Sequence, residues 1–325
     1  MRKVLAKLNS ENFQNRDYSF WVKLATRASV SVALTLILVK LAAWFMTDSA
    51  SMLASLTDSI LDSFASFFTF FAVRYAVVPA DKEHRFGHGK AECMAALMQS
   101  ALIIGSATLL LVHSVEQWVE GDPVQQPAIG VYVSLFAIVL TFGLVLVQRA
   151  AIRNTQSSAI SADALHFKSD LLLNASVIAA LLLSAYGWYW VDSLFAVLIA
   201  LYLAFGAIRI GWDAFQSLMD RELPDDEKKR IIKTIKDTPG ILGLHNLRTR
   251  GAGPTRFIQC HVELDDDLSL RAAHDIADHA ERRVRDLFED TDVIIHMDPA
   301  SVVTSPSETT PAEPAAQADD SGRSR

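Results

Sequence analysis

The sequence predicts an α-helical membrane protein with six transmembrane helices, followed by a small α+β cytoplasmic domain. Three observations predict this fold class. The 325 residues are 51% hydrophobic and only 21% charged, with a mean hydropathy of +0.23. Six apolar segments reach the length of about 20 residues that a helix needs to cross a bilayer. From about residue 221 onward, the composition becomes that of a soluble domain.

The six expected spans make up a transmembrane domain at 25–213, after an N-terminal arm at 1–24. The first, fourth and sixth are almost continuously apolar, as in LFAIVLTFGLVLV. The second, third and fifth carry polar residues and are expected to line the interior. Lys40 lies in the first span, where its long stem would let the ammonium reach the interface. The expected spans are 25–46, 50–75, 89–118, 128–149, 160–186 and 191–213.

The distribution of Lys and Arg predicts that both termini are cytoplasmic. Basic residues occur in the N-terminal arm, in the turn between the second and third spans, and after the fourth and sixth spans. The opposite loops, TDSA, EGDPVQQPAIG and YGWYW, contain no Lys or Arg. Because cytoplasmic loops carry an excess of these residues, the asymmetry predicts the orientation.

Residues 214–300 form the expected cytoplasmic domain, with the element order αββαβ. DDEKKRIIKTIKDTPG has the pattern of an amphipathic helix that ends at Pro239 and Gly240. LGLHNLRTR and TRFIQCHVEL alternate as strands across a GAGP hairpin, and DVIIHMDP makes a third strand. SLRAAHDIADHAERRVRDLFE predicts a helix capped by Ser269. The result is a small sheet with helices on one face, followed by a tail at 301–325 whose composition predicts disorder.

Two pairs of ionisable residues interrupt the apolar spans: Asp58 with Asp62, and His166 with Asp170. Each pair has the spacing i, i+4, which places both side chains on one helix face. Carboxylates within a membrane persist mainly where they face a cavity or bind an ion. Four such ligands suit tetrahedral Zn²⁺, and would admit Cd²⁺, Fe²⁺ or Co²⁺. The alternative is that the carboxylates only pair with polar groups. No Lys or Arg is expected at a matching depth, and Asp163 is expected to begin its helix.

Two further clusters contain histidines. Asp81, His84 and His88 lie in the turn PADKEHRFGHGKAE and could hold one metal ion, although a solvated polar turn explains them equally well. The second cluster belongs to the strands and long helix of the cytoplasmic domain, whose sheet is small enough to bring several ligands together. Its members are His245, His261, His274, His296 and Asp298.

Several classes of function are disfavoured. The net charge of −7 gives no indication of nucleic-acid binding, and no GxxxxGK[ST] motif indicates ATP binding. Cys93 and Cys260 are too few for a thiolate cluster. No HExxH-like motif is present, and four protein ligands would leave no open position for a catalytic water. We therefore expect no enzyme, no catalytic residue and no cofactor-binding residue. A passive metal channel or a metal-sensing membrane receptor remains the alternative to a transporter.

The stretches SASMLASLTDSILDS, RYAVVPADKEHRFGHGKAE, ADALHFKSD, SLMDRELPD, LRTR, GPTRFIQCHVEL and DVIIHMDP resemble the cation diffusion facilitator family. The resemblance runs from about residue 20 to residue 300 and is close to the bacterial zinc and ferrous-iron efflux pumps. It implies a homodimeric exporter of Zn²⁺, of Cd²⁺ as well, and with Fe²⁺ as a further candidate. It also implies a bacterial inner membrane location, proton-driven exchange by alternating access, and a metallochaperone-like cytoplasmic domain.

The resemblance also implies roles for residues. Asp58, Asp62, His166 and Asp170 match the family's transport site, and the turn cluster matches a loop site. The cytoplasmic cluster matches a binuclear zinc site in which Asp298 bridges two ions, so Zn²⁺ is expected as a structural and regulatory ion besides being the cargo. Lys90 and Asp220 match a charge pair at the dimer interface. Met297 departs from the family, because close relatives have Gln there.

Overall fold

The computed structural model describes residues 2–48, 50–120, 128–184, 191–288 and 290–303. The chain forms two compact units. The first contains residues up to Asp220 together with Ala252–Pro254, and the second contains Arg221–Gly251 and the residues from Thr255 onward. The tail expected at 301–325 begins within a short 3₁₀ helix, and its residues from 304 onward lie outside the described part.

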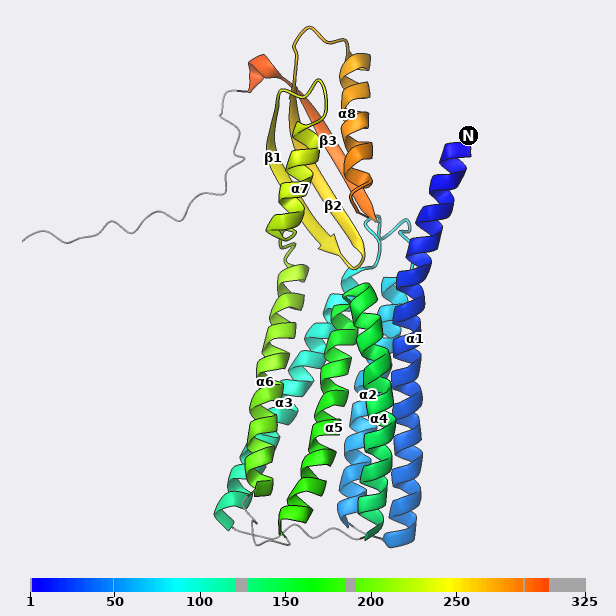
Figure 1. The fold of residues 1–325 in the computed structure, drawn as a ribbon, viewed down its shortest axis with the longest axis vertical. Helices are drawn as coiled ribbons and strands as arrows, with labels where there is room; N and C mark the ends of the chain where they lie inside the picture. Colours follow the sequence, from blue (N-terminus) through cyan, green and yellow to red (C-terminus); the bar gives the residue numbers. More distant parts are fainter. Residues whose placement is uncertain (1, 49, 121–127, 185–190, 289, 304–325) are drawn as a thin grey trace, which may run out of the picture. The chain divides into compact units, whose positions relative to one another are not determined.

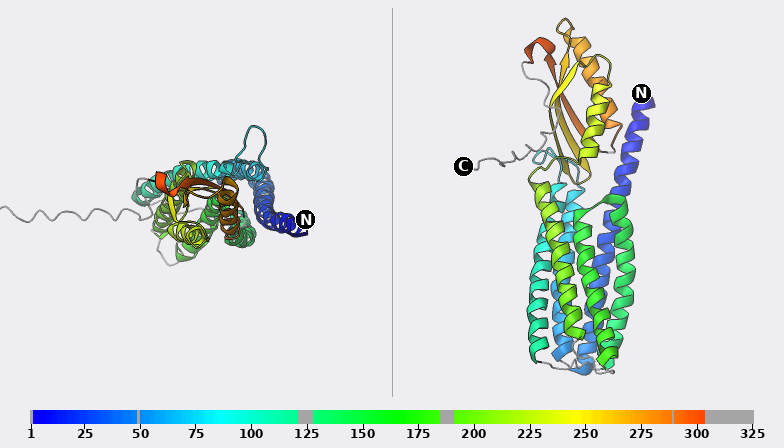
Figure 2. Two further views of the ribbon diagram at one scale, coloured as in Figure 1. Left: turned by 90° about the horizontal axis from the view of Figure 1, so that it is seen from above. Right: turned by 60° about the vertical axis from the view of Figure 1, so that its left-hand side comes forward.

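Six long helices make up the first unit and lie side by side (Figure 1, Figure 2). The first of them begins at Arg2, so the expected N-terminal arm is helical and continuous with the first span. The helices are α1 (Arg2–Thr47), α2 (Ala50–Ala76), α3 (Lys90–Glu120), α4 (Ala128–Thr155), α5 (Ser158–Ser184) and α6 (Val191–Leu218).

Five of these helices contain a segment that is long and apolar enough to cross a membrane. These segments are Tyr18–Thr47, Ser55–Ala76, Lys90–Glu116, Val131–Thr155 and Ser193–Leu218. The expected span at 160–186 corresponds to α5, which is not among the five and carries Asp163, Lys168 and Asp170 in its first half. α5 is enclosed by its neighbours, since it packs against α3, α4 and α6. The fold class of a helical membrane domain is thus confirmed.

Helices α3 and α6 pack against each other more extensively than any other pair of elements. Small residues permit this approach: Ala96 and Ala214 are buried between them, and a Cβ at Gly211 would lie 3.1 Å from the Cβ of Ser100. Close backbone approach over small residues is the usual way in which helices associate within membranes.

The second unit has the expected order α7–β1–β2–α8–β3. Its three strands form one sheet in the order β1-β2-β3, and β2 pairs with β3 in parallel, with His261 opposite His296. Ser269 caps the second helix as predicted, because its hydroxyl accepts a hydrogen bond from the Ala272 N–H. The elements are α7 (Asp225–Lys236), β1 (Gly243–Ala252), β2 (Thr255–Leu264), α8 (Leu270–Arg285), β3 (Thr291–Pro299) and the 3₁₀ helix η1 (Ala300–Val302).

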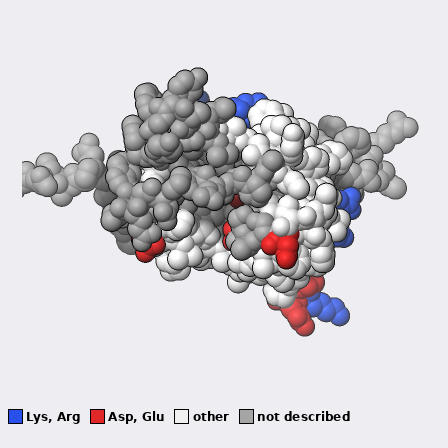
Figure 3. Space-filling model, turned by 90° about the horizontal axis from the view of Figure 1, so that it is seen from below, with Lys and Arg blue, Asp and Glu red and all other residues white. Residues whose placement is uncertain are grey.

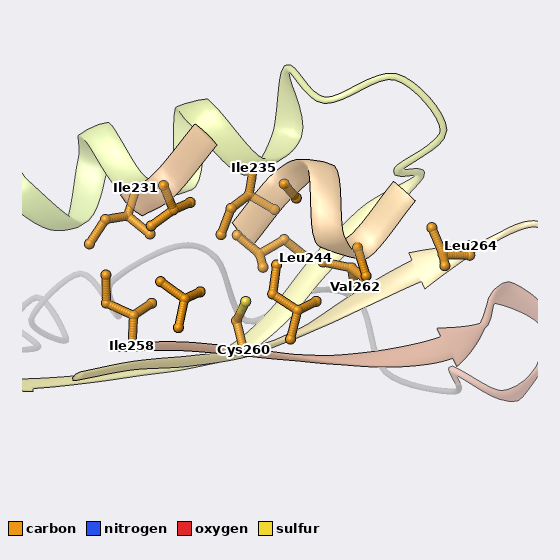
Figure 4. Close-up of a cluster of buried hydrophobic side chains, with 12 residues drawn as sticks. Ile231, Ile235, Leu244, Ile258, Cys260, Val262 and Leu264 are labelled. Carbon is orange, nitrogen blue, oxygen red and sulfur yellow. The ribbon is translucent and has the colours of Figure 1, made fainter. Parts of the chain in front are cut away.

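Both helices of this unit cover one face of the sheet and enclose its hydrophobic core (Figure 4). Ile231 and Ile235 of α7 meet Leu244, Ile258 and Val262 of the strands there, all five fully buried. Side chains alternate between the two faces of a strand. The residues between these core positions therefore point to the sheet's other face, where the histidines of the cytoplasmic cluster lie.

The end of the membrane unit seen in Figure 3 has few charged groups among its described residues. In that view most of the described surface is uncharged, with scattered acidic and basic side chains. Much of the expected loops EGDPVQQPAIG and YGWYW lies outside the described residues.

Candidate metal centre

Three of the four expected intramembrane ligands come together between α2 and α5. The Nε2 atom of His166 lies 3.2 Å from Oδ1 of Asp62 and 3.7 Å from Oδ2 of Asp170. One potential ligand atom from each residue lies within 4.8 Å of the others. The His166 side chain is only 13% exposed. We call these three residues the transport cluster.

His166 Nε2 is buried and makes no hydrogen bond of acceptable geometry, although two carboxylates approach it. One imidazole nitrogen and two hard carboxylate oxygens facing a common point form a donor set that suits a divalent cation such as Zn²⁺. The geometry therefore fits ion binding better than a closed set of polar pairs.

Asp58 lies one helical turn before Asp62 on α2 and is exposed. Its carboxylate is outside the transport cluster, which contains three residues rather than the expected four. The i, i+4 spacing places both carboxylates on one side of α2, but only Asp62 lies close to the α5 ligands.

Lys40 does not reach toward the interface, so that prediction was wrong. Its ammonium donates hydrogen bonds to Oγ of Ser59 at 2.6 Å and to the backbone oxygen of Ser55 at 3.2 Å, both on α2. It also interacts electrostatically with the carboxylates of Asp170, Asp62 and Asp58. The expectation that no cation lies at the depth of the carboxylates was therefore also wrong.

Asp163 is not a residue that begins its helix, because α5 begins at Ser158 and Asp163 is only 2% exposed. Its carboxylate accepts hydrogen bonds from Ser29 at 2.6 Å, from Ser66 at 3.2 Å and from the amide of Gln148 at 2.8 Å. The three donors belong to α1, α2 and α4. Asp163 thus joins four helices one turn before His166.

Glu92 is a further buried carboxylate that the sequence did not single out. It is 3% exposed and accepts hydrogen bonds from the Tyr18 hydroxyl at 2.6 Å and from the Ser157 hydroxyl. The sequence could have indicated this residue, because it is a carboxylate near the start of an apolar span and no Lys or Arg lies one helical turn away. Its role here is to hold α3 against α1 and the start of α5.

The turn cluster assembles as expected between α2 and α3. Oδ1 of Asp81 lies 3.4 Å from Nδ1 of His84, and its Oδ2 lies 3.4 Å from Nε2 of His88. Hydrogen bonds from the backbone N–H groups of His84 and Glu83 hold the pKa of Asp81 below its usual value. Nδ1 of His88 lies 3.2 Å from the Val78 carbonyl. Donation there would leave Nε2 as the ligand atom.

The cytoplasmic cluster gathers around Asp298 on the face of the sheet opposite the helices. Oδ2 of Asp298 lies 2.8 Å from Nδ1 of His261 and 3.3 Å from Nε2 of His245, and its Oδ1 lies 3.2 Å from Nε2 of His296. A carboxylate with imidazoles at both oxygens has the form of a bridging metal ligand. Glu263, which the sequence analysis missed, orients the other nitrogen of His245 at 3.2 Å.

One expected member of this cluster, His274, is placed elsewhere, and Met297 faces away from it. His274 is exposed on α8 and makes no ion pair with the cluster in the part of the chain that the structure describes. Met297 lies between His296 and Asp298 in β3 and therefore faces the opposite side, where it packs against the hydrophobic core. Its substitution for Gln thus changes the core side of the strand. Cys260 lies in the hydrophobic core on that same side, where burial raises the pKa of its thiol to about 12.

Lys90 and Asp220 form an ion pair within one chain, with Nζ 2.9 Å from Oδ1. Lys90 also donates a hydrogen bond to the Leu218 carbonyl at 3.3 Å. The pair therefore joins the first residue of α3 to the chain that follows α6.

Comparison with known proteins identifies the family. A model of the cation efflux transmembrane domain matches residues 26–219, and a model of the cation efflux protein cytoplasmic domain matches residues 223–300. The chain belongs to the cation efflux family. The cation-efflux pump FieF of Shewanella oneidensis is 56% identical over 289 residues, which are 89% of this chain and 98% of the relative. FieF of Klebsiella pneumoniae is 48% identical over 89% of this chain and 96% of the relative.

A solved zinc-form structure of CzrB is 30% identical to this cation efflux protein, with a TM-score of 0.25, and covers 26% of this chain and 99% of its own. The FieF relatives are cation diffusion facilitators of the YiiP type, which confirms the resemblance seen in the sequence. This cation efflux protein is therefore a multi-pass membrane transporter of divalent metal cations with a cytoplasmic domain.

Proposed function

We propose that this transporter exports Zn²⁺, and Cd²⁺ as well, from the cytoplasm in exchange for protons. It works as a homodimer, and alternating access carries the ion across the membrane. The single observation that supports this most is the transport cluster, Asp62, His166 and Asp170, in which Nε2 of His166 on α5 faces carboxylates of both α2 and α5. Asp58 would complete the set of ligands after a small movement of α2.

The exchange rests on competition for one set of ligands. A divalent metal needs ionised carboxylates and a neutral imidazole, so metal binding releases protons and protonation releases metal. His166 is the group whose ordinary protonation lies nearest to physiological pH. A compact cluster, with no line of ligands along the helices among the residues that the structure describes, also favours alternating access over a passive channel.

The orientation follows from the charges of the loops. We place both termini in the cytoplasm, because the loops TDSA, EGDPVQQPAIG and YGWYW contain no Lys or Arg. The bacterial inner membrane is the location that the resemblance to bacterial efflux pumps implies. Lys40 does not affect this assignment, since it lies within a span.

The function is tested by metal-dependent pH changes in proteoliposomes containing Zn²⁺, Cd²⁺, Fe²⁺ or Mn²⁺. Wild-type protein should move protons against Zn²⁺ and Cd²⁺. His166→Asp should keep a ligand at this position but lose the imidazole proton, so both the pH dependence near neutrality and the metal preference should change. A His166→Asp variant with the wild-type pH profile would show that His166 does not couple metal release to protons.

The cytoplasmic cluster is proposed to bind two structural Zn²⁺ ions and to stabilise the dimer. Asp298 would bridge them, with His245 and His261 at one oxygen and His296 at the other. When bound, zinc would cross-link these strands, and binding to the folded dimer stabilises it by mass action.

Asp298→Ala should therefore weaken Zn²⁺ binding by the cytoplasmic domain by at least about tenfold, because metal sites lose that much even when only an outer partner is removed. Zn²⁺ should also no longer shift the dimer dissociation constant. Calorimetric titration of the full chain and analytical ultracentrifugation would measure both. Asp275→Ala, an exposed carboxylate on α8, is the matched control. Equal behaviour of the two variants would contradict the proposal.

A further inference from the structure

Lys40 is a cation bound to α2, the helix that contributes Asp62 to the transport cluster. Its ammonium donates to Oγ of Ser59 at 2.6 Å and to the Ser55 backbone oxygen at 3.2 Å. These acceptors lie on either side of Asp58 along α2, and Asp62 follows Ser59 within one turn. The ammonium is thus fixed on the segment of α2 that supplies the metal ligands.

Both acceptors of Lys40 are neutral oxygens. Among the residues that the structure describes, no carboxylate forms an ion pair with Lys40 within 4.0 Å. Its charge is therefore not cancelled by direct contact, and it acts at longer range on the carboxylates of Asp170, Asp62 and Asp58. A partly buried charge of this kind is screened less than one in water.

A divalent cation that enters the cluster meets this fixed positive charge. The three carboxylates attract the cation, and the ammonium repels it. A transporter needs both the attraction and the repulsion, because the ion must bind well enough to enter and weakly enough to leave. Given the proposed function, on which this inference rests, we propose that Lys40 sets the metal affinity of the transport cluster and thereby permits release of the ion.

A purely structural role would depend on the hydrogen bonds between α1 and α2 instead. The two roles separate in three variants. Lys40→Gln keeps a hydrogen-bond donor and removes the charge. Lys40→Arg keeps the charge, and Lys40→Met removes both.

The test measures the Kd for Cd²⁺ and Zn²⁺ in full-length protein in nanodiscs, with the turn and cytoplasmic clusters disabled by Asp81→Ala and Asp298→Ala. At mildly alkaline pH, where proton competition is weak, Lys40→Gln and Lys40→Met should bind metal about tenfold or more tightly. In proteoliposomes the same variants should lower both KM and kcat, because tighter binding slows release. Lys40→Arg should retain wild-type values.

Each outcome either supports or overturns the inference. A Lys40→Gln variant with the wild-type Kd, or a weaker one, overturns the inference, and so does a defect confined to Lys40→Met. If Lys40→Met does not fold, the comparison of the Gln and Arg variants decides the question. Failure of the proposed function would give a different result. The protein that carries Asp81→Ala and Asp298→Ala would then bind metal equally well with and without Asp62→Ala.

Discussion

Replacing Asp62 by Ala is expected to abolish metal transport. Asp62 is the ligand that α2 contributes to the transport cluster, and its loss would leave His166 and Asp170 on α5 alone. Because loss of an outer partner already costs a metal site about 10- to 100-fold, loss of a ligand should lower the transport rate by more than about 100-fold. Stopped-flow fluorescence of a metal indicator inside proteoliposomes would measure the rate.

Asp213→Asn provides the matched control for Asp62→Ala. Asp213 is a carboxylate on α6 whose side chain is exposed and lies outside the three metal-ligand clusters. Its variant should transport metal at the wild-type rate. Comparable transport by Asp62→Ala and wild-type protein would exclude the transport cluster as the pathway of the ion.

Replacing Asp163 by Ala is expected to destabilise the membrane domain severely. The change removes the acceptor of hydrogen bonds from Ser29, Ser66 and Gln148 and leaves three buried donors without it. Each hydrogen bond to a charged group contributes about 1.5–3 kcal/mol, so the free energy of unfolding should fall by about 3 kcal/mol or more. Unfolding in mixed micelles, followed by tryptophan fluorescence, would measure the loss.

Ser66→Ala tests the same network with one bond removed. Its hydrogen bond to Asp163 is the longest of the three, at 3.2 Å. It should cost about 1 kcal/mol, well below the cost of Asp163→Ala. Equal stability of wild-type and Asp163→Ala protein would show that these bonds contribute no net stability.

The cytoplasmic domain was predicted from the sequence almost completely. Its strands were predicted from the alternation of apolar and polar residues with period two. Ser269 marks the start of one helix by capping it, and Pro239 and Gly240 mark the end of the other. The positions of His261 and His296 on the face opposite the core follow from the same alternation, because one core residue lies on either side of each. Which histidines meet Asp298 required the parallel register of β2 and β3, and His274 could not be excluded without it.

The membrane domain was predicted less completely. The spacing of His166 and Asp170 placed them on one helix face, and the structure retains that arrangement. The contacts of Lys40 and Asp163 were predicted wrongly. For Lys40 the reason is that its long amphipathic stem can extend toward either the interface or a neighbouring helix. The choice depends on whether an acceptor such as Ser59 faces it, and Ser59 belongs to a different helix.

Spacing within a segment determined which elements form and which side chains share a face, since helix and strand periods are local properties of the chain. Apolar length marked most of the membrane spans in the same way. Only the tertiary structure decided that Lys40 bonds to α2, that Asp163 joins four helices and that Asp58 stands apart from its three partners. These outcomes depend on which helices lie together, and that depends on packing between residues far apart in the chain.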